Sequence, residues 1–501
     1  MGERDMSRAD VCLILEGTYP YVTGGVSSWT HDLLLAQSDL TFHLVTLLPK
    51  GDHTTPRYQI PANVVGQSQI YIQSLSPGAK SMRRSEAFFS SLEKPLLQFQ
   101  SRGGLPELGE ILRILAPVRH ALGSRVLMDS RQAWRMLLSM YTASTPASSF
   151  LDYFWSWRSL VGGMLSVLLA DLPEAGVYHA ISTGYAGLFL ARANLETGRP
   201  AILTEHGIYT NERRIEMAMA NWLHDIADSS LQIDIPQKTL KDLWVDTFVA
   251  YSHACYQACG EIITLYEGNQ QFQLQDGAPQ EKLGVIPNGV DYERYSAIEK
   301  DNRNRPPAIA LIGRVVPIKD VKTFIRACSI LKGIVPGIEA LVLGPTDEDE
   351  PYFRECQNMV NHLNLDETVT FTGRVNLDEY LGQIDVVVLT SISEAQPLVV
   401  LEAGAVGIPS VATDVGSCRE LIFGSHAEYP PLGPGGDITP LCNPSATAHS
   451  LARLLTDPDW YDRCSLAIKE RVRVYYNKRA VDGTYRKLYE KHLGLEARVN
   501  T

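Results

Sequence analysis

The sequence predicts an α/β protein of two doubly wound, Rossmann-like domains, the first carrying a helical insertion. Three observations support this fold class. The chain has 501 residues, which is too long for one typical domain. Short aliphatic runs alternate with helical patterns on both sides of residue 300, as in parallel sheets whose strands are joined by helices. The segment 296–307 (SAIEKDNRNRPP) is charged and ends in two prolines, which is typical of a linker.

Composition and charge exclude several classes of protein. The net charge of −12 argues against nucleic acid as the main partner, because surfaces that bind nucleic acid are basic. The eight cysteines are scattered and lack a matching zinc-ligand spacing, so we expect free thiols in a reducing cytosol. The polar N-terminus predicts no signal peptide, and the apolar run 160–172 is too short to span a membrane. We therefore expect a cytoplasmic protein, with peripheral attachment to the inner membrane as an open alternative.

The first domain is expected over residues 1–300 and begins with a strand at Val11 to Leu15. The following loop contains Gly24-Gly25 and leads into a helix that runs to about residue 37. Two glycines let the backbone approach a phosphate or a sugar closely, although an ordinary turn would also use them. His206 directly follows another predicted strand, 201–204, and should lie at the carboxyl end of the same sheet. Further strands are expected at 41–47, 177–181, 261–266 and 283–290.

A basic helical insertion is expected at about 71–160. Residues 71–135 contain ten Lys or Arg against five Asp or Glu, in a chain that is otherwise acidic. Such a surface could dock on an anionic membrane or on a partner protein. A helical embellishment with a solvated basic face explains the same pattern and is the simpler interpretation.

The second domain is expected over residues 308–477, followed by a helix over 478–501 that crosses back to the first domain. Its first strand, 308–312, leads into the loop GRVVPIKD, which carries Arg314 and Lys319 at its two ends. A guanidinium and an ammonium group can stabilise the charge of a leaving diphosphate without a metal ion. Other strands are expected at 341–344, 369–373, 386–390 and 409–413.

The stretch 385–414 reads as strand, loop, helix and strand. Glu394 lies in the loop, and Glu402 lies eight residues later in a helix that should begin near Pro397. Both carboxylates should therefore lie near the carboxyl end of the sheet, where open α/β sheets bind ligands. The free amides at the start of that helix also favour a phosphate.

The pattern SxSEAxPLVxLEAxAxGxPxVAT around Glu394 and Glu402 resembles the retaining glycosyltransferases of family 4. The resemblance implies the GT-B fold, in which two Rossmann-like domains face a cleft, and transfer of a sugar without a metal or another cofactor. It implies that Glu394 holds sugar hydroxyls, that Glu402 holds the ribose and that His206 contacts the sugar near the reacting carbon. Pro397 lacks the amide that many relatives offer. The catalytic residues implied are His206, Glu394, Arg314 and Lys319, and the donor-binding residues are Gly24, Gly25, Arg314, Lys319, Arg374, Ala395, Gln396, Leu398 and Glu402.

Three segments, LEGTYPYVTGGVSSW, TEHGIYTNERR and ISEAQPLVVLEA, resemble more specifically the cytosolic glycosyltransferases of bacterial Pel exopolysaccharide synthesis. This resemblance implies a UDP-sugar donor, either UDP-glucose or a UDP-N-acetylhexosamine, and a growing polysaccharide as acceptor. It also implies an inner-membrane polysaccharide synthesis and export complex as partner.

Other functions remain open at this point. A dinucleotide-dependent oxidoreductase would share the fold, but no G-x-G-x-x-G follows any predicted strand. A catalytically silent scaffold that binds nucleotide sugars would keep the same motifs as an enzyme. A phosphorylase or an epimerase of the same fold would differ only in its product.

Overall fold

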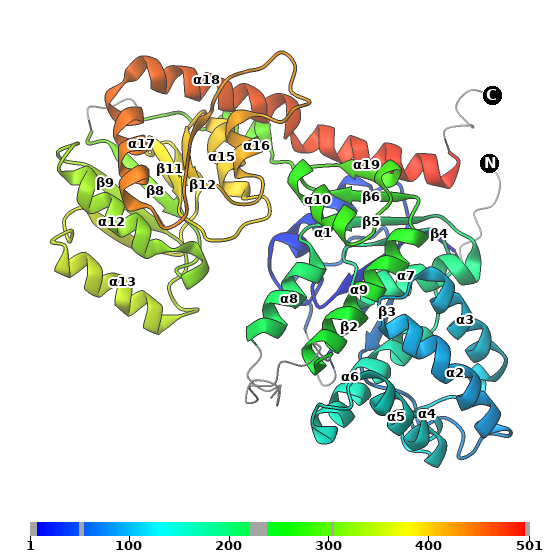
Figure 1. The fold of residues 1–501 in the computed structure, drawn as a ribbon. Coiled ribbons are helices and arrows are strands. Elements are labelled where there is room, and N and C mark those ends of the chain that lie inside the picture. The colour runs from blue at the N-terminus through cyan, green and yellow to red at the C-terminus, as the bar shows by residue number, and fades with distance from the viewer. Residues whose placement is uncertain (1–7, 50–54, 220–237, 302–304, 496–501) are drawn as a thin grey trace. The chain divides into compact units, whose positions relative to one another are not determined.

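The computed structural model describes residues 8–49, 55–219, 238–301 and 305–495, which form two compact units. The first unit comprises the chain up to Thr264, residues 269–285 and the chain from Tyr485 onward. The second comprises residues 265–268 and 286–484. Each unit is built around its own sheet (Figure 1). Residues 1–7, 302–304 of the predicted linker and 496–501 of the predicted last helix lie outside the described residues.

The first unit contains a seven-stranded parallel sheet with the order β3-β2-β1-β4-β5-β6-β7. The three central strands β1, β4 and β5 are almost entirely buried, since helices cover both faces of the sheet, and this burial accounts for their unbroken apolar runs. The edge strand β3 alternates between exposed and half-buried residues. The strands are β1 (Ala9–Glu16), β2 (Phe42–Leu48), β3 (Val64–Tyr71), β4 (Ala175–Ala180), β5 (Ala201–Glu205), β6 (Glu261–Thr264) and β7 (Leu283–Val285).

Two groups of helices belong to this unit. The helices of the doubly wound core are α1 (Gly25–Ala36), α7 (Tyr185–Thr197), α8 (Tyr209–Met219), α9 (Leu240–Ala258), α10 (Glu267–Gln275) and η3 (Gln280–Lys282). The helical insertion between β3 and β4 is confirmed, and it comprises α2 (Ser85–Gln100), α3 (Leu105–Leu115), η1 (Ala116–Ala121), α4 (Ser124–Leu127), α5 (Arg131–Ser144) and α6 (Phe150–Leu169). The inner half of α6 is buried in the core of the unit. Among the described residues, no helix is long and apolar enough to cross a membrane.

The second unit contains a six-stranded parallel sheet with the order β10-β9-β8-β11-β12-β13. Its strands are β8 (Ala308–Ile312), β9 (Glu339–Leu343), β10 (Val369–Gly373), β11 (Val386–Leu389), β12 (Ser410–Thr413) and β13 (Gly436–Thr439). Its helices are α11 (Tyr292–Ser296), η4 (Pro317–Lys319), α12 (Val321–Lys332), α13 (Glu350–His362), α14 (Asp378–Leu381), α15 (Leu398–Val406), α16 (Cys418–Phe423), α17 (Pro444–Thr456) and α18 (Pro458–Tyr475). The predicted fold class, two doubly wound α/β halves, is therefore confirmed.

The division between the units differs from the predicted domain boundary at residue 300. Residues 286–300 belong to the second unit, because Asn288 N donates to Gln396 Oε1 at 2.7 Å and Tyr295 OH donates to Glu402 Oε1 at 3.1 Å. The predicted terminal helix is α19 (Lys478–Leu493), of which only the part from Tyr485 belongs to the first unit.

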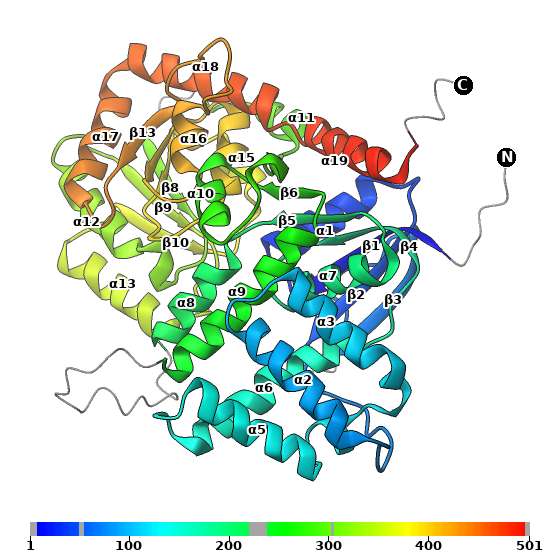
Figure 2. The ribbon, with the colours of Figure 1, turned by 45° about the vertical axis from the view of Figure 1, so that its right-hand side comes forward.

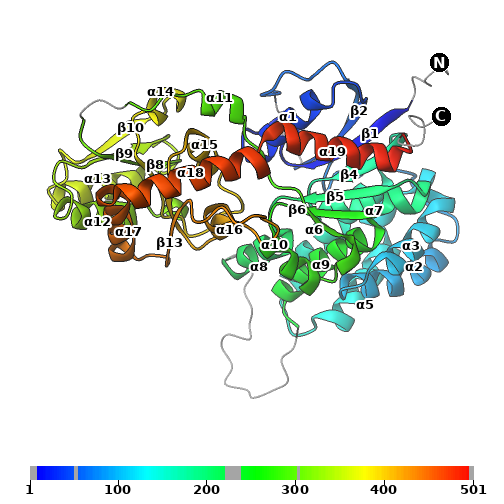
Figure 3. The same cartoon turned by 90° about the horizontal axis from the view of Figure 1, so that it is seen from above.

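Tyrosines of α19 anchor this helix to the first sheet. His179 of β4 is fully buried, with Nδ1 2.8 Å from Tyr489 OH and Nε2 2.9 Å from Thr204 Oγ1. Tyr485 packs edge-on against Trp29, with 5.4 Å between the ring centroids. Figure 3 shows α19 beside β1, β4 and β5 of this unit. Burial lowers the pKa of His179 to about 3, so the folded protein keeps this ring neutral.

Acidification should therefore destabilise the protein. The unfolded chain binds a proton at His179 below its ordinary pKa of about 6.5, whereas the folded protein does not. The contribution of His179 to the free energy of unfolding is fully present above that pKa. It falls as the pH drops, by on the order of 2 kcal/mol at about pH 5. The unfolding midpoint of His179→Gln, measured between neutral pH and about pH 5, should change less than that of the parent. The exposed His362 gives the control His362→Gln, and equal pH dependence in all three proteins would contradict this account.

The second unit contains a buried ion pair between α18 and the loop after α16. Arg471 Nε lies 2.6 Å from Glu428 Oε2 and Nη2 lies 2.9 Å from Oε1, with side-chain exposures of 1% and 4%. The same guanidinium donates to the carbonyls of Ile422 at 2.9 Å and Gly433 at 2.6 Å. One side chain thus provides the countercharge of a buried carboxylate and also donates to two backbone carbonyls.

Removing this arginine should strongly destabilise the protein. Arg471→Gln leaves Glu428 buried without its countercharge, which costs about 3–5 kcal/mol of unfolding free energy. Two residues along the same helix, Arg473 pairs with Glu470 at 2.6 Å on the surface, so Arg473→Gln is the matched control and should unfold like the parent. Denaturant unfolding of the three proteins measures the difference, and similar losses from both substitutions would refute the role assigned to burial.

Candidate functional site

In the second unit, two predicted site residues meet at the carboxyl end of the sheet. Lys319 ends the loop after β8, and Glu394 lies in the loop after β11, the neighbouring strand. Lys319 Nζ donates to Glu394 Oε1 at 2.5 Å. The two side chains are 21% and 14% exposed, so the pair is largely withdrawn from water but still accessible to a ligand.

Backbone contacts hold the two loops together. Thr390 Oγ1 donates to the carbonyls of Lys319 and Asp320, both at 3.0 Å, and Ile392 N donates to Ile318 O at 2.8 Å. On the other side, a Cβ at Gly416 would lie 2.2 Å from Glu394 O, and Gly416 has a positive φ of 52°. Only glycine fits this close approach, which fixes the backbone on which Glu394 is carried.

Three glycines end the strands β8, β9 and β10. Gly313 N donates to Leu343 O at 2.9 Å, and Gly344 N donates to Gly373 O at 3.0 Å. A Cβ on Gly344 would lie only 2.1 Å from Gly313 O, so the ends of β8 and β9 can pack this closely only with glycine at position 344. Arg374 follows the third glycine with an exposed side chain.

The helix α15 begins at Leu398 with Pro397 as its N-cap, which confirms the predicted start of this helix. Glu402 lies within it, and its Oε1 accepts the bond from Tyr295 OH, so the two glutamates have different partners. Burial raises the pKa of Glu402. Before the helix, Ala395 O accepts from Ser417 N at 2.9 Å. Gln396 Nε2 is buried without a hydrogen-bond partner in the described part of the chain.

Arg314 does not join the Lys319–Glu394 pair in this structure. Its Nη1 donates to Glu348 Oε2 at 2.8 Å, and both side chains are largely exposed, at 56% and 40%. An exposed pair of this kind contributes little to stability and can exchange partners. The two predicted phosphate-binding residues therefore differ. Lys319 is held in place by Glu394, whereas Arg314 is only loosely paired with Glu348.

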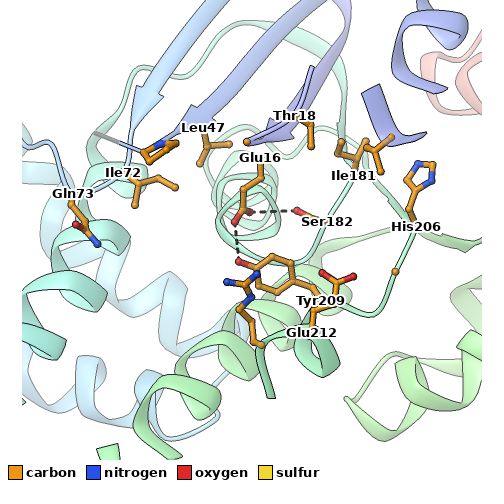
Figure 4. Close-up of a pocket in the computed structure, with 15 residues that line it drawn as sticks. Glu16, Thr18, Leu47, Ile72, Gln73, Ile181, Ser182, His206, Tyr209 and Glu212 are labelled. Atoms are coloured by element: carbon orange, nitrogen blue, oxygen red, sulfur yellow. Dashed lines mark hydrogen bonds between the residues drawn. The ribbon is translucent and has the colours of Figure 1, made fainter. Parts of the chain in front are cut away.

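The first unit has a cavity of about 480 Å³ at the carboxyl ends of β1, β4 and β5 (Figure 4). Glu16, the last residue of β1, points into it and accepts a hydrogen bond from Tyr209 OH at 2.8 Å. Ala186 N and Ser182 Oγ donate to its other oxygen at 3.1 and 3.4 Å. Burial raises the pKa of Glu16 despite these donors.

His206 lines the same cavity and is brought there by its position directly after β5. Its ring packs edge-on against Trp29, with the centroids 4.5 Å apart. Burial lowers the pKa of His206 to about 4, so the imidazole is neutral near pH 7. Among the described residues, neither His206 Nε2 nor Arg213 Nε has a hydrogen-bond partner, although both are buried, so the cavity offers polar atoms to a ligand.

Gly24 and Gly25 stand at the start of α1 in the first unit. A Cβ on either residue would find no atom within 4 Å, so the backbone here is open to its surroundings. The structure thus places Gly24, Gly25 and His206 in the first unit. It places the other predicted site residues in the second.

The sequence interpretation assigned no role to two carboxyl groups of the first unit, Glu16 and Glu205. Glu16 lines the cavity. Glu205, directly before His206, is fully buried, and its Oε2 accepts from Tyr256 OH at 2.9 Å and from Gln273 Nε2 at 3.0 Å. Burial raises the pKa of Glu205 to about 7. Both glutamates are the last residue of a buried strand, and an acidic residue at that position was the available signal.

Each unit therefore offers a distinct chemistry. The second unit holds a cation beside a carboxylate near a helix N-terminus. This arrangement suits a ligand that carries both an anionic group and hydroxyl groups. The first unit offers a cavity with a neutral imidazole, a guanidinium and carboxyl groups, which suits a polar, uncharged molecule.

Two protein families match the chain. The family described as "Domain of unknown function (DUF3492)" matches residues 9–281, more than half of the chain. The family "Glycosyl transferases group 1" matches residues 295–471, which lie in the second unit.

Among curated relatives, the MMP alpha-(1->4)-mannosyltransferase of Mycolicibacterium hassiacum is 25% identical over 268 residues, covering 52% of this chain and 58% of the relative. The amylovoran biosynthesis glycosyltransferase AmsK of Erwinia amylovora is 26% identical over 174 residues, covering 33% and 41%. The chain thus spans less than two thirds of the length of either relative.

Solved structures share the fold over nearly the whole chain. HepE of Anabaena in complex with UDP gives a TM-score of 0.57 at 14% identity, covering 96% of this chain and 99% of HepE. The same protein in complex with UDP-glucose gives 0.53 at 13% identity with the same coverage. The chain therefore belongs to the DUF3492 family and has the GT-B fold, and its residues 295–471 match the group 1 glycosyltransferases.

Proposed function

We propose that this protein is a glycosyltransferase that moves a sugar from a UDP-sugar to a growing polysaccharide, with retention of configuration and without a metal ion. The observation that carries this proposal is the Lys319–Glu394 pair at the carboxyl end of the second sheet. A nucleotide diphosphate sugar has both groups that such a pair can bind, a diphosphate for the ammonium and sugar hydroxyls for the carboxylate.

In this proposal the donor binds between Lys319 and Glu394 and replaces their ion pair. The diphosphate accepts hydrogen bonds from Lys319 Nζ, and a sugar hydroxyl donates to the Glu394 carboxylate. Negative charge grows on the diphosphate as the glycosidic bond breaks, so a fixed ammonium stabilises the transition state more than the ground state. Arg314, released from its exposed pair with Glu348, adds a second cation.

Glu402 is assigned to the ribose. Its carboxyl group already accepts a hydroxyl bond from Tyr295, which supports a role in binding hydroxyl groups. A ribose is unchanged during transfer, so this contact contributes equally to the ground state and the transition state. The roles of Gly24, Gly25, His206, Arg374 and the amides of 395, 396 and 398 remain predictions from the family resemblance.

The identity of both substrates is also proposed. HepE binds UDP and UDP-glucose, as its complexes state, and this supports a uridine donor here. UDP-glucose and a UDP-N-acetylhexosamine both remain possible sugars. The relative from Erwinia amylovora is named for amylovoran biosynthesis, and the three resembling segments favour a Pel-type exopolysaccharide as acceptor, made beside an inner-membrane export complex.

Retention follows from attack on the face that the leaving group occupies. The bond between the anomeric carbon and the phosphate oxygen breaks, and a bond to the acceptor oxygen forms on the same face. The acceptor proton passes to the departing phosphate oxygen. No protein base is needed for this step, and the positive charge at Lys319 makes the phosphate a better leaving group.

Turnover of a UDP-sugar by the full chain tests the proposal, and the reaction should proceed in EDTA. Lys319→Ala should nearly abolish transfer and weaken UDP binding by about 1.5–3 kcal/mol, the worth of a hydrogen bond to a charged group. Lys332→Ala is the control, because Lys332 is an exposed lysine at the far end of the helix that follows.

Three results would count against this assignment. UDP binding by Lys319→Ala as tight as that of the parent would show that Lys319 does not bind the diphosphate. Strict dependence on added manganese would exclude the metal-free mechanism. UDP binding without any turnover would favour the nucleotide-sugar-binding scaffold over the enzyme.

The two glutamates should have different kinetic signatures. Glu394→Gln should lower kcat and keep UDP affinity, because the lost contact is to the sugar and Lys319 is freed from its ion pair. Glu402→Gln should weaken UDP itself by roughly 1–3 kcal/mol. Calorimetry with UDP beside steady-state rates measures both, with the exposed Glu350→Gln as control. Equal loss of UDP affinity in the two variants would mean that Glu394 does not face the sugar.

A further inference from the structure

The helical insertion exposes large apolar side chains on two neighbouring helices. Trp134 and Leu138 of α5 are 45% and 39% exposed, and Leu151 and Trp155 of α6 are 63% and 60% exposed. We call these four residues the α5–α6 face. Tryptophan buries more apolar surface than most residues, so two tryptophans left this exposed on adjacent helices are unusual for a surface that only contacts water.

The two tryptophans of this face are linked through one aromatic cluster. The Trp134 ring lies 5.9 Å from the ring of Phe150 and 6.0 Å from that of Phe154, and Phe154 lies 4.9 Å from Trp155. Phe154 therefore bridges the exposed tryptophans of the two helices. Figures 1 and 2 show α5 and α6 side by side.

Along both helices, the exposed residues of the α5–α6 face change from apolar to basic with distance from the loop that connects α5 and α6. Five residues connect Ser144, the end of α5, to Phe150, the start of α6, so the two helices form an antiparallel hairpin. Leu138 and Leu151 lie toward the connection, and one turn farther from it lie Trp134 and Trp155. Arg131 and Arg158 follow at helical spacing on the same sides. Each helix thus carries leucine, tryptophan and arginine in line.

The charge of the insertion is opposite to that of the rest of the chain. Residues 80–160 contain eleven Lys or Arg and six Asp or Glu, whereas the whole chain has a net charge of −12. Arg131 makes no ion pair within the described part of the chain. Arg135 pairs with Glu86 at 3.2 Å at the surface, where such a pair is weak enough to yield to another anion. Arg158 is half-exposed and is held by Asp129 at 3.0 Å and by the carbonyl of Met128 at 3.0 Å.

We propose that the α5–α6 face docks this protein on the surface of an anionic lipid bilayer. Tryptophan side chains favour the boundary between headgroups and hydrocarbon, leucines can enter slightly deeper, and arginines pair with lipid phosphates. The order of leucine, tryptophan and arginine along the hairpin matches that sequence of depths. The acidic remainder of the chain is repelled by the same lipids, which orients the molecule with its insertion toward the bilayer.

A protein partner could also cover the α5–α6 face. The exposed arginines around the tryptophans favour phosphate groups over an apolar protein surface. This inference is independent of the proposed transferase activity, because lipid binding by the face requires no nucleotide sugar. Loss of one would leave the other intact.

Cosedimentation of the full chain with vesicles tests the inference. The parent should bind vesicles of phosphatidylglycerol and phosphatidylethanolamine and leave phosphatidylcholine vesicles largely unbound, and added salt should weaken the binding. The double variant Leu151→Ser/Trp155→Gln should lose on the order of tenfold in partitioning, from the apolar surface it no longer buries. Arg131→Gln should lose roughly fivefold, the equivalent of about 1 kcal/mol for one basic residue near an anionic surface.

Matched controls distinguish lipid binding through the α5–α6 face from nonspecific hydrophobic binding and from loss of binding by unfolding. Leu466 of α18 is 71% exposed in the other unit, and Leu466→Ser should bind vesicles like the parent. Thermal unfolding of the double variant should match that of the parent, and the single variant Trp155→Gln repeats the test with a smaller change. The inference is overturned by a parent that does not bind anionic vesicles, or by variants that bind as well as the parent. It is equally overturned if the double variant only changes the oligomeric state, since the face would then contact a second copy.

Discussion

Every paired strand in the described part of both sheets is parallel, and this constraint governs the rest of the structure. Parallel neighbours require a crossover connection, which contains a helix between most of the strands here, and these helices cover the sheet faces and bury the central strands. It also brings all the carboxyl strand ends to one edge. Glu16 and His206 meet at that edge in the first unit, and Lys319 and Glu394 meet there in the second. Residues distant in sequence become neighbours because their strands point the same way.

The two units use burial differently at these edges. In the first unit, burial lowers the pKa of His206 to about 4 and raises the pKa of Glu16. In the second unit, Lys319 and Glu394 form a close pair at the boundary with water, with side chains 21% and 14% exposed. The first cavity, with its hydrogen-bonding groups, suits a polar molecule, and the accessible pair of the second unit suits an anionic group.

Much of the fold could be predicted from the sequence, because period and composition are local. The apolar runs of β1, β8 and β11 and the start of α15 at Leu398 were all readable from neighbouring residues. The boundary between the two units could not be predicted from the sequence as closely. The charged segment 296–307 marks a linker by composition, but Asn288 and Tyr295 join the second unit through hydrogen bonds to Gln396 and Glu402. Such long-range contacts leave no local signal.

The sequence alone determined the fold class, the loops that carry Glu394 and Lys319, and the basic charge of the insertion, since each depends on residue type and spacing along the chain. Only the tertiary structure decided which charges pair, with Lys319 on Glu394 and Arg314 on Glu348. It alone also revealed that Trp134 and Trp155 form one exposed face. Pairing and exposure are properties of three-dimensional packing, in which a side chain's energy depends on neighbours that the sequence does not list beside it.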